Sequence, residues 1–174
     1  MQDDISDGVK KAIADGIADP KRVCIVEASY GGYAALAGTT LTPELYACAV
    51  SYAGVSNFPD MHGYFKKAFG IDFTNESFTT TRMGDTFADA AQLNATSPAL
   101  HADRVTANVL LLHSELDVTV PILQSELMDT ALTKAGKKVE FVRMDGDDHY
   151  LSLEQTRVRL LREVEKFLAA TIGT

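Results

Sequence analysis

The sequence predicts an α/β fold in which helices cover both faces of a mostly parallel sheet, giving three layers. Four short apolar runs of strand length occur at residues 23–26, 47–53, 108–113 and 139–144. Helical patterns separate them, and most of the runs are apolar almost throughout, as expected of strands buried on both faces of a parallel sheet. The 174 residues are 46% hydrophobic and 23% charged, which predicts one globular domain over residues 1–174.

The first elements follow in order from these patterns. Residues 2–15 predict an amphipathic helix that ends at Gly16, with an apolar face formed by Ile5, Val9, Ala12 and Ile13. The dipeptide Asp19-Pro20 predicts a loop before the first strand. That strand leads through Ser29 into a helix, and Thr42-Pro43 then turns the chain into the second strand.

Residues 54–100 break the pattern of strands and helices. Aromatic residues are spread here among Asn, Thr, Asp and Gly, namely Phe58, Tyr64, Phe65, Phe69, Phe73 and Phe78. We expect short helices and loops that lie over one face of the sheet and cover a substrate pocket.

Regular elements return after residue 100. Pro121 suits the first turn of a helix that follows the third strand and ends at Gly136, with an apolar face of Leu123, Leu127, Met128, Ala131 and Leu132. After the fourth strand, residues 152–155 (Ser-Leu-Glu-Gln) match a capping box that starts a final helix. Its inward face is predicted to hold Leu161, Val164, Phe167 and Leu168.

Composition limits the possible partners and surroundings. A net charge of −8 argues against nucleic acid or an anionic membrane surface. No run approaches the roughly 18 apolar residues of a membrane-spanning helix, and the start has neither a basic nor an apolar signal region, so we expect a cytoplasmic protein. Cys24 and Cys48 lie in apolar runs and are expected to be buried thiols, at a spacing that suits no zinc site.

Ser29 occupies the switch from the first strand to its helix. A serine between small residues at such a turn matches the nucleophile elbow G-x-S-x-G, which holds the hydroxyl out at the tip of a sheet. Here Glu27 stands in place of the first glycine and Gly31 in place of the second. An ordinary strand-to-helix turn that contains a serine is the competing interpretation.

Two other strand ends supply partners for a serine nucleophile, which needs a base and a group to orient that base. Asp117 follows the third strand and His149 follows the fourth. The order Ser29, Asp117, His149 is that of the α/β-hydrolase triad. Glu115 would reach the same neighbourhood as Asp117, and His149 also fits a surface histidine in a polar turn.

The remaining polar candidates have simpler explanations. His113 ends an apolar strand and is expected to be a hydrogen-bonded core residue, whereas His62 and His101 lie in irregular segments. Asp145, Asp147 and Asp148 suit turn and capping roles. No cluster has metal-ligand spacing and no glycine-rich loop resembles a phosphate cradle, so neither a metal nor another cofactor is expected.

Taken together, these motifs make the chain resemble the C-terminal part of the catalytic domain of the prolyl oligopeptidase family, in particular its dipeptidyl-peptidase and acylaminoacyl-peptidase-like branch. The resemblance covers nearly the whole chain and is carried by DPKRV (19–23), ASYGGYA (28–34), RMGD (82–85), TSP (96–98), VLLLHSELDVTVP (109–121) and DH (148–149). It implies a partial α/β-hydrolase fold with Ser29 as nucleophile, Asp117 as orienting acid and His149 as general base. The backbone N–H of Tyr30 would contribute to the oxyanion hole.

Three departures from the family pattern lead to further expectations. Glu27 is expected to crowd the elbow, and Ser114 replaces the glycine that usually follows His113. The strands that normally precede the first one here are missing, together with the loop that supplies a second oxyanion donor, so the sequence resembles a chain truncated at its N-terminus. An incomplete sheet of this kind favours self-association.

The function expected from these features is a serine-type peptidase that hydrolyses peptide bonds of short peptides through an acyl-enzyme. The partner is then a peptide or small acyl substrate. A carboxylesterase of the same fold and a catalytically inactive fragment are the alternatives, because the triad alone does not distinguish amide from ester substrates.

Overall fold

The computed structural model describes residues 2–71, 81 and 83–173. Its sheet has four strands in the order β1-β2-β3-β4, which are Cys24–Ala28, Cys48–Tyr52, Asn108–Ser114 and Val139–Met144. All three neighbouring pairs are parallel. The predicted α/β fold is therefore confirmed, and each strand lies within two residues of its predicted position.

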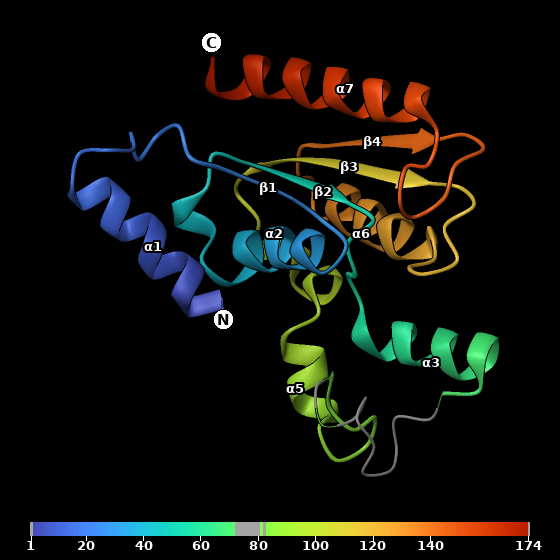
Figure 1. The fold of residues 1–174 in the computed structure, drawn as a ribbon. Helices are drawn as coiled ribbons and strands as arrows, with labels where there is room; N and C mark the ends of the chain where they lie inside the picture. The colour runs from blue at the N-terminus through green and yellow to red at the C-terminus, as the bar shows by residue number, and fades with distance from the viewer. Residues whose placement is uncertain (1, 72–80, 82, 174) are drawn as a thin grey trace.

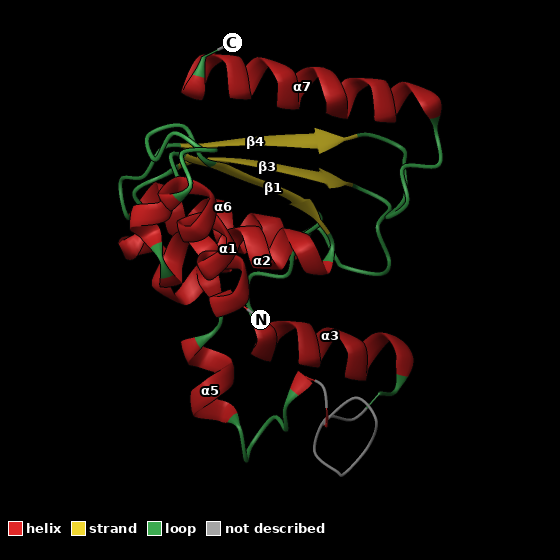
Figure 2. Ribbon diagram, turned by 60° about the vertical axis from the view of Figure 1, so that its left-hand side comes forward, coloured by secondary structure: helices red, strands yellow, loops and turns green. Residues whose placement is uncertain are grey.

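Helices cover the two faces of the sheet and make the three expected layers (Figure 2). Helix α7 (Glu154–Ile172) lies on one face, and α1 (Gln2–Ala14), α2 (Tyr30–Leu41) and α6 (Leu123–Lys134) lie on the other. Strand β3 shows why both faces need a cover. Its Val109 and Leu111 pack on the α2 and α6 side, whereas Leu110 and Leu112 pack on the α7 side, because successive side chains of a strand point to opposite faces.

Helix α7 differs from its prediction at two points. Leu161 is 65% exposed, and the neighbouring Leu160 packs against the sheet instead. The prediction of a capping box at residues 152–155 is also wrong, because Leu153 is the N-cap and its side chain makes no capping hydrogen bond. The Ser152 hydroxyl instead donates to Asp148 Oδ2 at 2.7 Å. The acceptor near the start of the helix is Asp147 Oδ2, which accepts hydrogen bonds from Leu153 N at 3.3 Å and from the Thr156 hydroxyl.

The segment 54–100 contains more regular structure than its composition suggested. Helix α3 (Phe58–Phe69) begins after Asn57, whose side chain accepts from Asp60 N at 3.2 Å, and ends at Gly70 with φ 67°. Helix α5 (Ala90–Ala95) and the 3₁₀ segment η2 (Pro98–Arg104) follow, and a second 3₁₀ segment, η1 (Pro43–Leu45), precedes β2. Helices α3 and α5 lie beyond α2, away from the sheet (Figure 1). Three residues named in the sequence analysis lie outside the described residues, namely the aromatic residues Phe73 and Phe78 of the predicted pocket cover and Arg82 of the RMGD motif.

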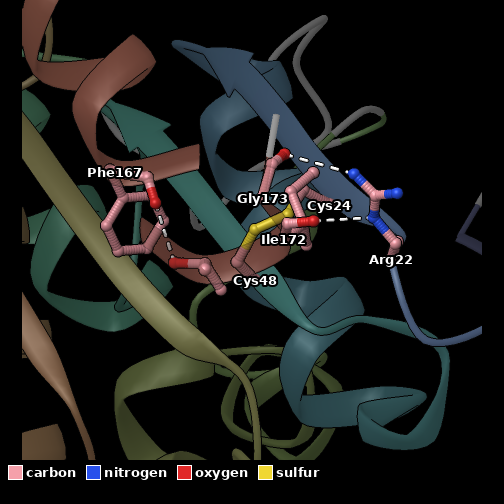
Figure 3. The surroundings of a disulfide bond; sticks show 7 residues. Arg22, Cys24, Cys48, Phe167, Ile172 and Gly173 are labelled. Carbon is pink, nitrogen blue, oxygen red and sulfur yellow. Dashed lines mark hydrogen bonds between the residues drawn. A yellow bond between two sulfur atoms is a disulfide. The ribbon is translucent and has the colours of Figure 1, made fainter. Parts of the chain in front are cut away.

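The expectation of two free thiols is wrong in this structure, which joins Cys24 and Cys48 in a disulfide (Figure 3). The two residues are direct partners in the β1–β2 register, and their Cα atoms are 4.6 Å apart, within the range that a disulfide spans. Arg22 lies beside them and donates to the backbone oxygens of Ile172 at 2.6 Å and Gly173 at 3.2 Å. The start of β1 is therefore fastened both to β2 and to the end of α7.

Strand β1 forms one edge of the sheet. Among the strands that the structure describes it pairs only with β2. Val26 is 42% exposed on this edge, and Ile5, Val9, Val23 and Ile25 help to line a groove of about 380 Å³ alongside it.

Within the described part of the chain, no helix combines the length and apolar character needed to cross a membrane.

Candidate active site

Ser29 lies between β1 and α2 in a sharply turned backbone, with φ 56° and ψ −120°. A positive φ is unfavourable for a residue with a side chain, so the surrounding contacts must hold this conformation. The Ser29 amide donates to Tyr52 O at 2.8 Å. Gly32 lets α2 approach β2, because a Cβ there would lie 2.8 Å from Tyr52 O and 2.9 Å from Gly54 Cα. This is the geometry of a nucleophile elbow.

The structure accommodates Glu27 in the elbow, because the residue beside it, Gly31, has no side chain. A Cβ at Gly31 would lie 3.0 Å from Glu27 Cβ and 2.7 Å from its Oε2. The missing side chain at Gly31 therefore makes room for Glu27, which is exposed. The elbow keeps its shape with a carboxylate two residues before the serine.

The structure brings Ser29, His149 and Asp117 together at the carboxyl ends of β1, β4 and β3. His149 Nε2 lies 3.0 Å from Ser29 Oγ, and His149 Nδ1 lies 2.7 Å from Asp117 Oδ2. The side chain of His149 is 9% exposed and that of Asp117 is fully buried. Glu115, the competing acid, is exposed, and the imidazole of His149 lies between the other two groups.

Asp117 is held as a carboxylate by several donors. Its Oδ1 accepts from Thr119 N and Val120 N, each at 2.8 Å, and its Oδ2 also lies 3.4 Å from His113 Nε2. Burial by itself raises the pKa of Asp117, but the hydrogen bonds from His113, His149 and Val120 outweigh it, so that the pKa lies below its usual value. An ionised Asp117 accepts a hydrogen bond from the Nδ1–H group of His149, which leaves the lone pair of His149 Nε2 directed at Ser29.

The other three histidines are hydrogen-bonded to residues other than Ser29. His113 is fully buried, with Nδ1 2.8 Å from Ser125 Oγ and Nε2 2.9 Å from Val120 O, as expected of a core residue. His62 Nδ1 lies 3.2 Å from Thr86 Oγ1, and His101 Nε2 lies 3.0 Å from Asn94 O. His149 is therefore the histidine that this fold directs at Ser29.

Tyr30, the expected oxyanion donor, is the first residue of α2 and directly follows Ser29. Its backbone N–H lies at the N-terminus of the helix, where the dipole favours negative charge. Three described non-glycine residues have a positive φ, and all three lie near this edge of the sheet: Ser29 after β1, Ala53 after β2 and Leu151 in the turn after His149. The site is thus built from sharp turns at strand ends.

A pocket of about 630 Å³ opens beside Ser29. Its apolar wall is formed by Tyr33, Val55, Phe58, Met61, Phe65 and Val120, and the rings of Tyr33 and Phe58 meet edge to face with centroids 4.9 Å apart. Asp89 is the charged side chain among the described lining residues, and its Oδ2 accepts from Asp85 N at 2.7 Å. The sequence predicted a pocket cover here with Phe58 and Phe65 among its aromatic residues, but did not indicate which residues line the pocket. Phe58, Met61 and Phe65 have the i, i+3, i+7 spacing of one helix face, which could have identified them.

Comparison with known proteins identifies the family of this chain. A model of the prolyl oligopeptidase family matches residues 1–174. The chain belongs to the prolyl oligopeptidase family. Dipeptidyl aminopeptidase BIII of Pseudoxanthomonas mexicana is 29% identical over 175 residues, and the uncharacterized peptidase YuxL of Bacillus subtilis is 34% identical over 153 residues. These matches cover 99% and 86% of the chain.

Solved structures of peptidases share the α/β-hydrolase fold of this chain. A puromycin-hydrolyzing peptidase of Mycobacterium tuberculosis superposes with a TM-score of 0.80 at 28% identity, over 95% of this chain and 25% of the other. An acylaminoacyl peptidase of Pyrococcus horikoshii superposes with a TM-score of 0.84 at 22% identity, over 99% of this chain and 28% of the other. The chain spans about a quarter of the length of the curated relatives that it matches, 25% of the dipeptidyl aminopeptidase and 22% of the peptidase YuxL.

Proposed function

We propose that this chain carries the catalytic triad of a serine-type peptidase that hydrolyses peptide bonds of short peptides through an acyl-enzyme. The observation that carries this proposal is the position of His149, with one ring nitrogen 3.0 Å from Ser29 Oγ and the other 2.7 Å from Asp117 Oδ2. A serine hydroxyl becomes a competent nucleophile when a neighbouring base accepts its proton and a third group orients that base.

In the proposed mechanism His149 Nε2 takes the proton of Ser29 as Oγ attacks the substrate carbonyl carbon. Asp117 stabilises the imidazolium that forms and keeps its ring in place. His149 then returns the proton to the leaving amine, and the acyl group stays on Ser29. A water molecule, deprotonated by the same nitrogen, releases the acid and restores the serine.

The oxyanion that forms during attack needs hydrogen-bond donors. Tyr30 N–H is one donor in this proposal, because it adjoins Ser29 at the N-terminus of α2. In this fold the second donor comes from a loop earlier in the sheet, and none of the described residues before β1 belongs to such a loop.

The pocket beside Ser29 supports an apolar substrate side chain. Val55, Met61 and Val120 are buried in its wall, and burying an apolar side chain against such a surface contributes about 25 cal/mol per Å². Peptides with a bulky uncharged residue on the acyl side of the scissile bond are the substrates we propose.

The test is reaction of the full chain with a fluorophosphonate probe, followed by mass spectrometry of the labelled peptide. We expect the label on Ser29, its loss in Ser29→Ala, and a rate lower by roughly 10³-fold or more in His149→Gln. Ser6→Ala is the control, because Ser6 is hydrogen-bonded to Thr42, at the opposite end of α2 from Ser29. Labelling that persists in Ser29→Ala would contradict the assignment of the nucleophile.

Substrate panels separate the alternatives. Turnover of peptide p-nitroanilides supports the peptidase, whereas turnover of p-nitrophenyl esters alone would favour a carboxylesterase with the same triad. A chain that is folded but never labelled would be the inactive fragment, and the peptidase proposal would then fail for these 174 residues.

A further inference from the structure

Tyr52, the last residue of β2, is hydrogen-bonded both to the nucleophile residue and to the segment that carries the base. Its carbonyl oxygen accepts from Ser29 N at 2.8 Å. Its hydroxyl lies 3.0 Å from Asp148 O and 2.8 Å from Ser114 Oγ. Tyr52 is 5% exposed and Ser114 is fully buried, so water does not compete freely for these bonds.

The chemistry of the partners fixes the direction of each bond. Asp148 O is a carbonyl and can only accept, so the single hydroxyl proton of Tyr52 is donated to it. Ser114 must then donate its own proton to Tyr52 Oη. The result is a chain from Ser114 through Tyr52 to the backbone of Asp148, the residue that precedes His149.

The Tyr52 hydroxyl remains a donor across the working range of pH. Burial raises the pKa of Tyr52 to about 12, the bond from Ser114 acts in the opposite direction, and the nearby carboxylates of Asp117, Asp147 and Asp148 add to the increase. The hydroxyl therefore stays protonated, and the bond to Asp148 O is present wherever the protein is folded.

The turn that carries His149 needs an anchor on the Ser29 side. Asp148 bonds mostly within the turn, where its Oδ1 accepts from Tyr150 N at 2.9 Å and from Ser152 N at 3.3 Å. Asp147 O accepts from Leu116 N at 3.1 Å, which ties the turn to the Asp117 loop. The hydroxyl of Tyr52 adds a tie to β2, the strand that also holds the amide of Ser29.

We propose that Tyr52 is a positioning residue that sets the His149 turn relative to Ser29, with Ser114 completing its hydrogen bonds. This inference rests on the proposed function, because it assigns Tyr52 a task in the same site. It also gives a purpose to Ser114, which stands where the family pattern has glycine. Tyr52 touches no reacting atom and acts through His149.

The experiment compares Tyr52→Phe and Ser114→Gly with the full wild-type chain. Tyr52→Phe removes the hydroxyl but keeps the ring and the carbonyl that binds Ser29. Tyr46→Phe is the matched control, since Tyr46 is equally buried at 5% exposure but packs on the α2 side of the sheet. Two quantities are measured below the melting range, namely the fluorophosphonate labelling of Ser29 at several probe concentrations and hydrogen exchange of the amides in residues 148–153.

We expect Tyr52→Phe to lower the limiting labelling rate by roughly 10- to 100-fold, as for a displaced catalytic group, with little change in the probe concentration that gives half of that rate. Exchange of the amides in residues 148–153 should become faster. Ser114→Gly should shift both quantities in the same direction by less, and Tyr46→Phe should shift neither. This division distinguishes positioning from a general loss of packing.

Several results would overturn the inference. Unchanged exchange in Tyr52→Phe would mean that the hydroxyl does not anchor the turn, and faster exchange with an unchanged labelling rate would mean that the anchor does not serve the site. Equal slowing in Tyr46→Phe would indicate a general effect of losing a buried hydroxyl. A wild-type chain without labelling would refute the proposed function, and the exchange data would then still decide whether Tyr52 anchors the His149 turn.

Discussion

Opening the Cys24–Cys48 disulfide should lower the free energy of unfolding by about 3.4 kcal/mol, according to the loop-entropy relation. The two cysteines are 24 residues apart in the sequence, and reduction lets the unfolded chain explore the conformations that a closed loop of this size excludes. The loop contains most of β1, Ser29 and α2. The folded state keeps its β1–β2 hydrogen bonds when the disulfide opens, so the effect falls mainly on the unfolded chain.

Urea unfolding followed by circular dichroism, with and without a phosphine reductant, measures this difference. With a slope of about 2 kcal/mol per M, the midpoint should fall by about 1.7 M on reduction. The variant Cys24→Ala/Cys48→Ala is the control, because its midpoint should be low and should not respond to reductant. A wild-type midpoint that does not move, or an intact mass with both thiols free after purification without reductant, would refute the reasoning and restore the thiols expected from the sequence.

Three further predictions concern single contacts. Burial by itself raises the pKa of Asp147, but its hydrogen bonds outweigh this effect and hold the pKa below its usual 3.8. The stability lost in Asp147→Asn should therefore be largest at neutral pH and should shrink as the pH falls below 3.8. Urea midpoints of both proteins from pH 7 to pH 3 test this, and a difference that stays constant with pH would contradict it. Gly31→Ala should lower the free energy of unfolding by about 1–3 kcal/mol, because the added Cβ meets Glu27. Adding Glu27→Gly to that variant should recover most of the lost stability in thermal melts. If the effects of the two substitutions simply add, the two side chains do not compete for space. The open edge at β1 should make the chain self-associate at high concentration, and Val26→Lys should reduce the association seen by sedimentation velocity; a wild-type chain that stays monomeric would count against this.

The sequence was most informative where burial decides the structure. Strand β3 was predictable because both of its faces are buried, so Val109 to Leu112 form one apolar run. The face of α7 was less predictable because Leu160 and Leu161 are adjacent and both suit an apolar stripe. Only packing against the sheet selects Leu160.

Contacts between distant segments were harder to foresee. The spacing of Cys24 and Cys48 carries no information about strand register, which sets them opposite each other. The residues of the proposed triad could be named because each follows a strand, and parallel strands bring their carboxyl ends to one edge. Tyr52 could not, since its role depends on a backbone oxygen of Asp148, 96 residues away.

The left-handed backbone at Ser29, Ala53 and Leu151 has a consequence for laboratory evolution. Glycine adopts such angles without steric cost, although it also gives the unfolded chain more freedom. In a library selected for stability, we expect glycine to be tolerated or enriched at Ala53 and Leu151, and we expect other substitutions at these two positions to be depleted. A selection for labelling at Ser29 should instead retain the serine in spite of its backbone cost. At each position, the enrichment under selection for labelling can be divided by the enrichment under selection for stability. A high ratio would identify a position whose strained backbone is needed for the reaction.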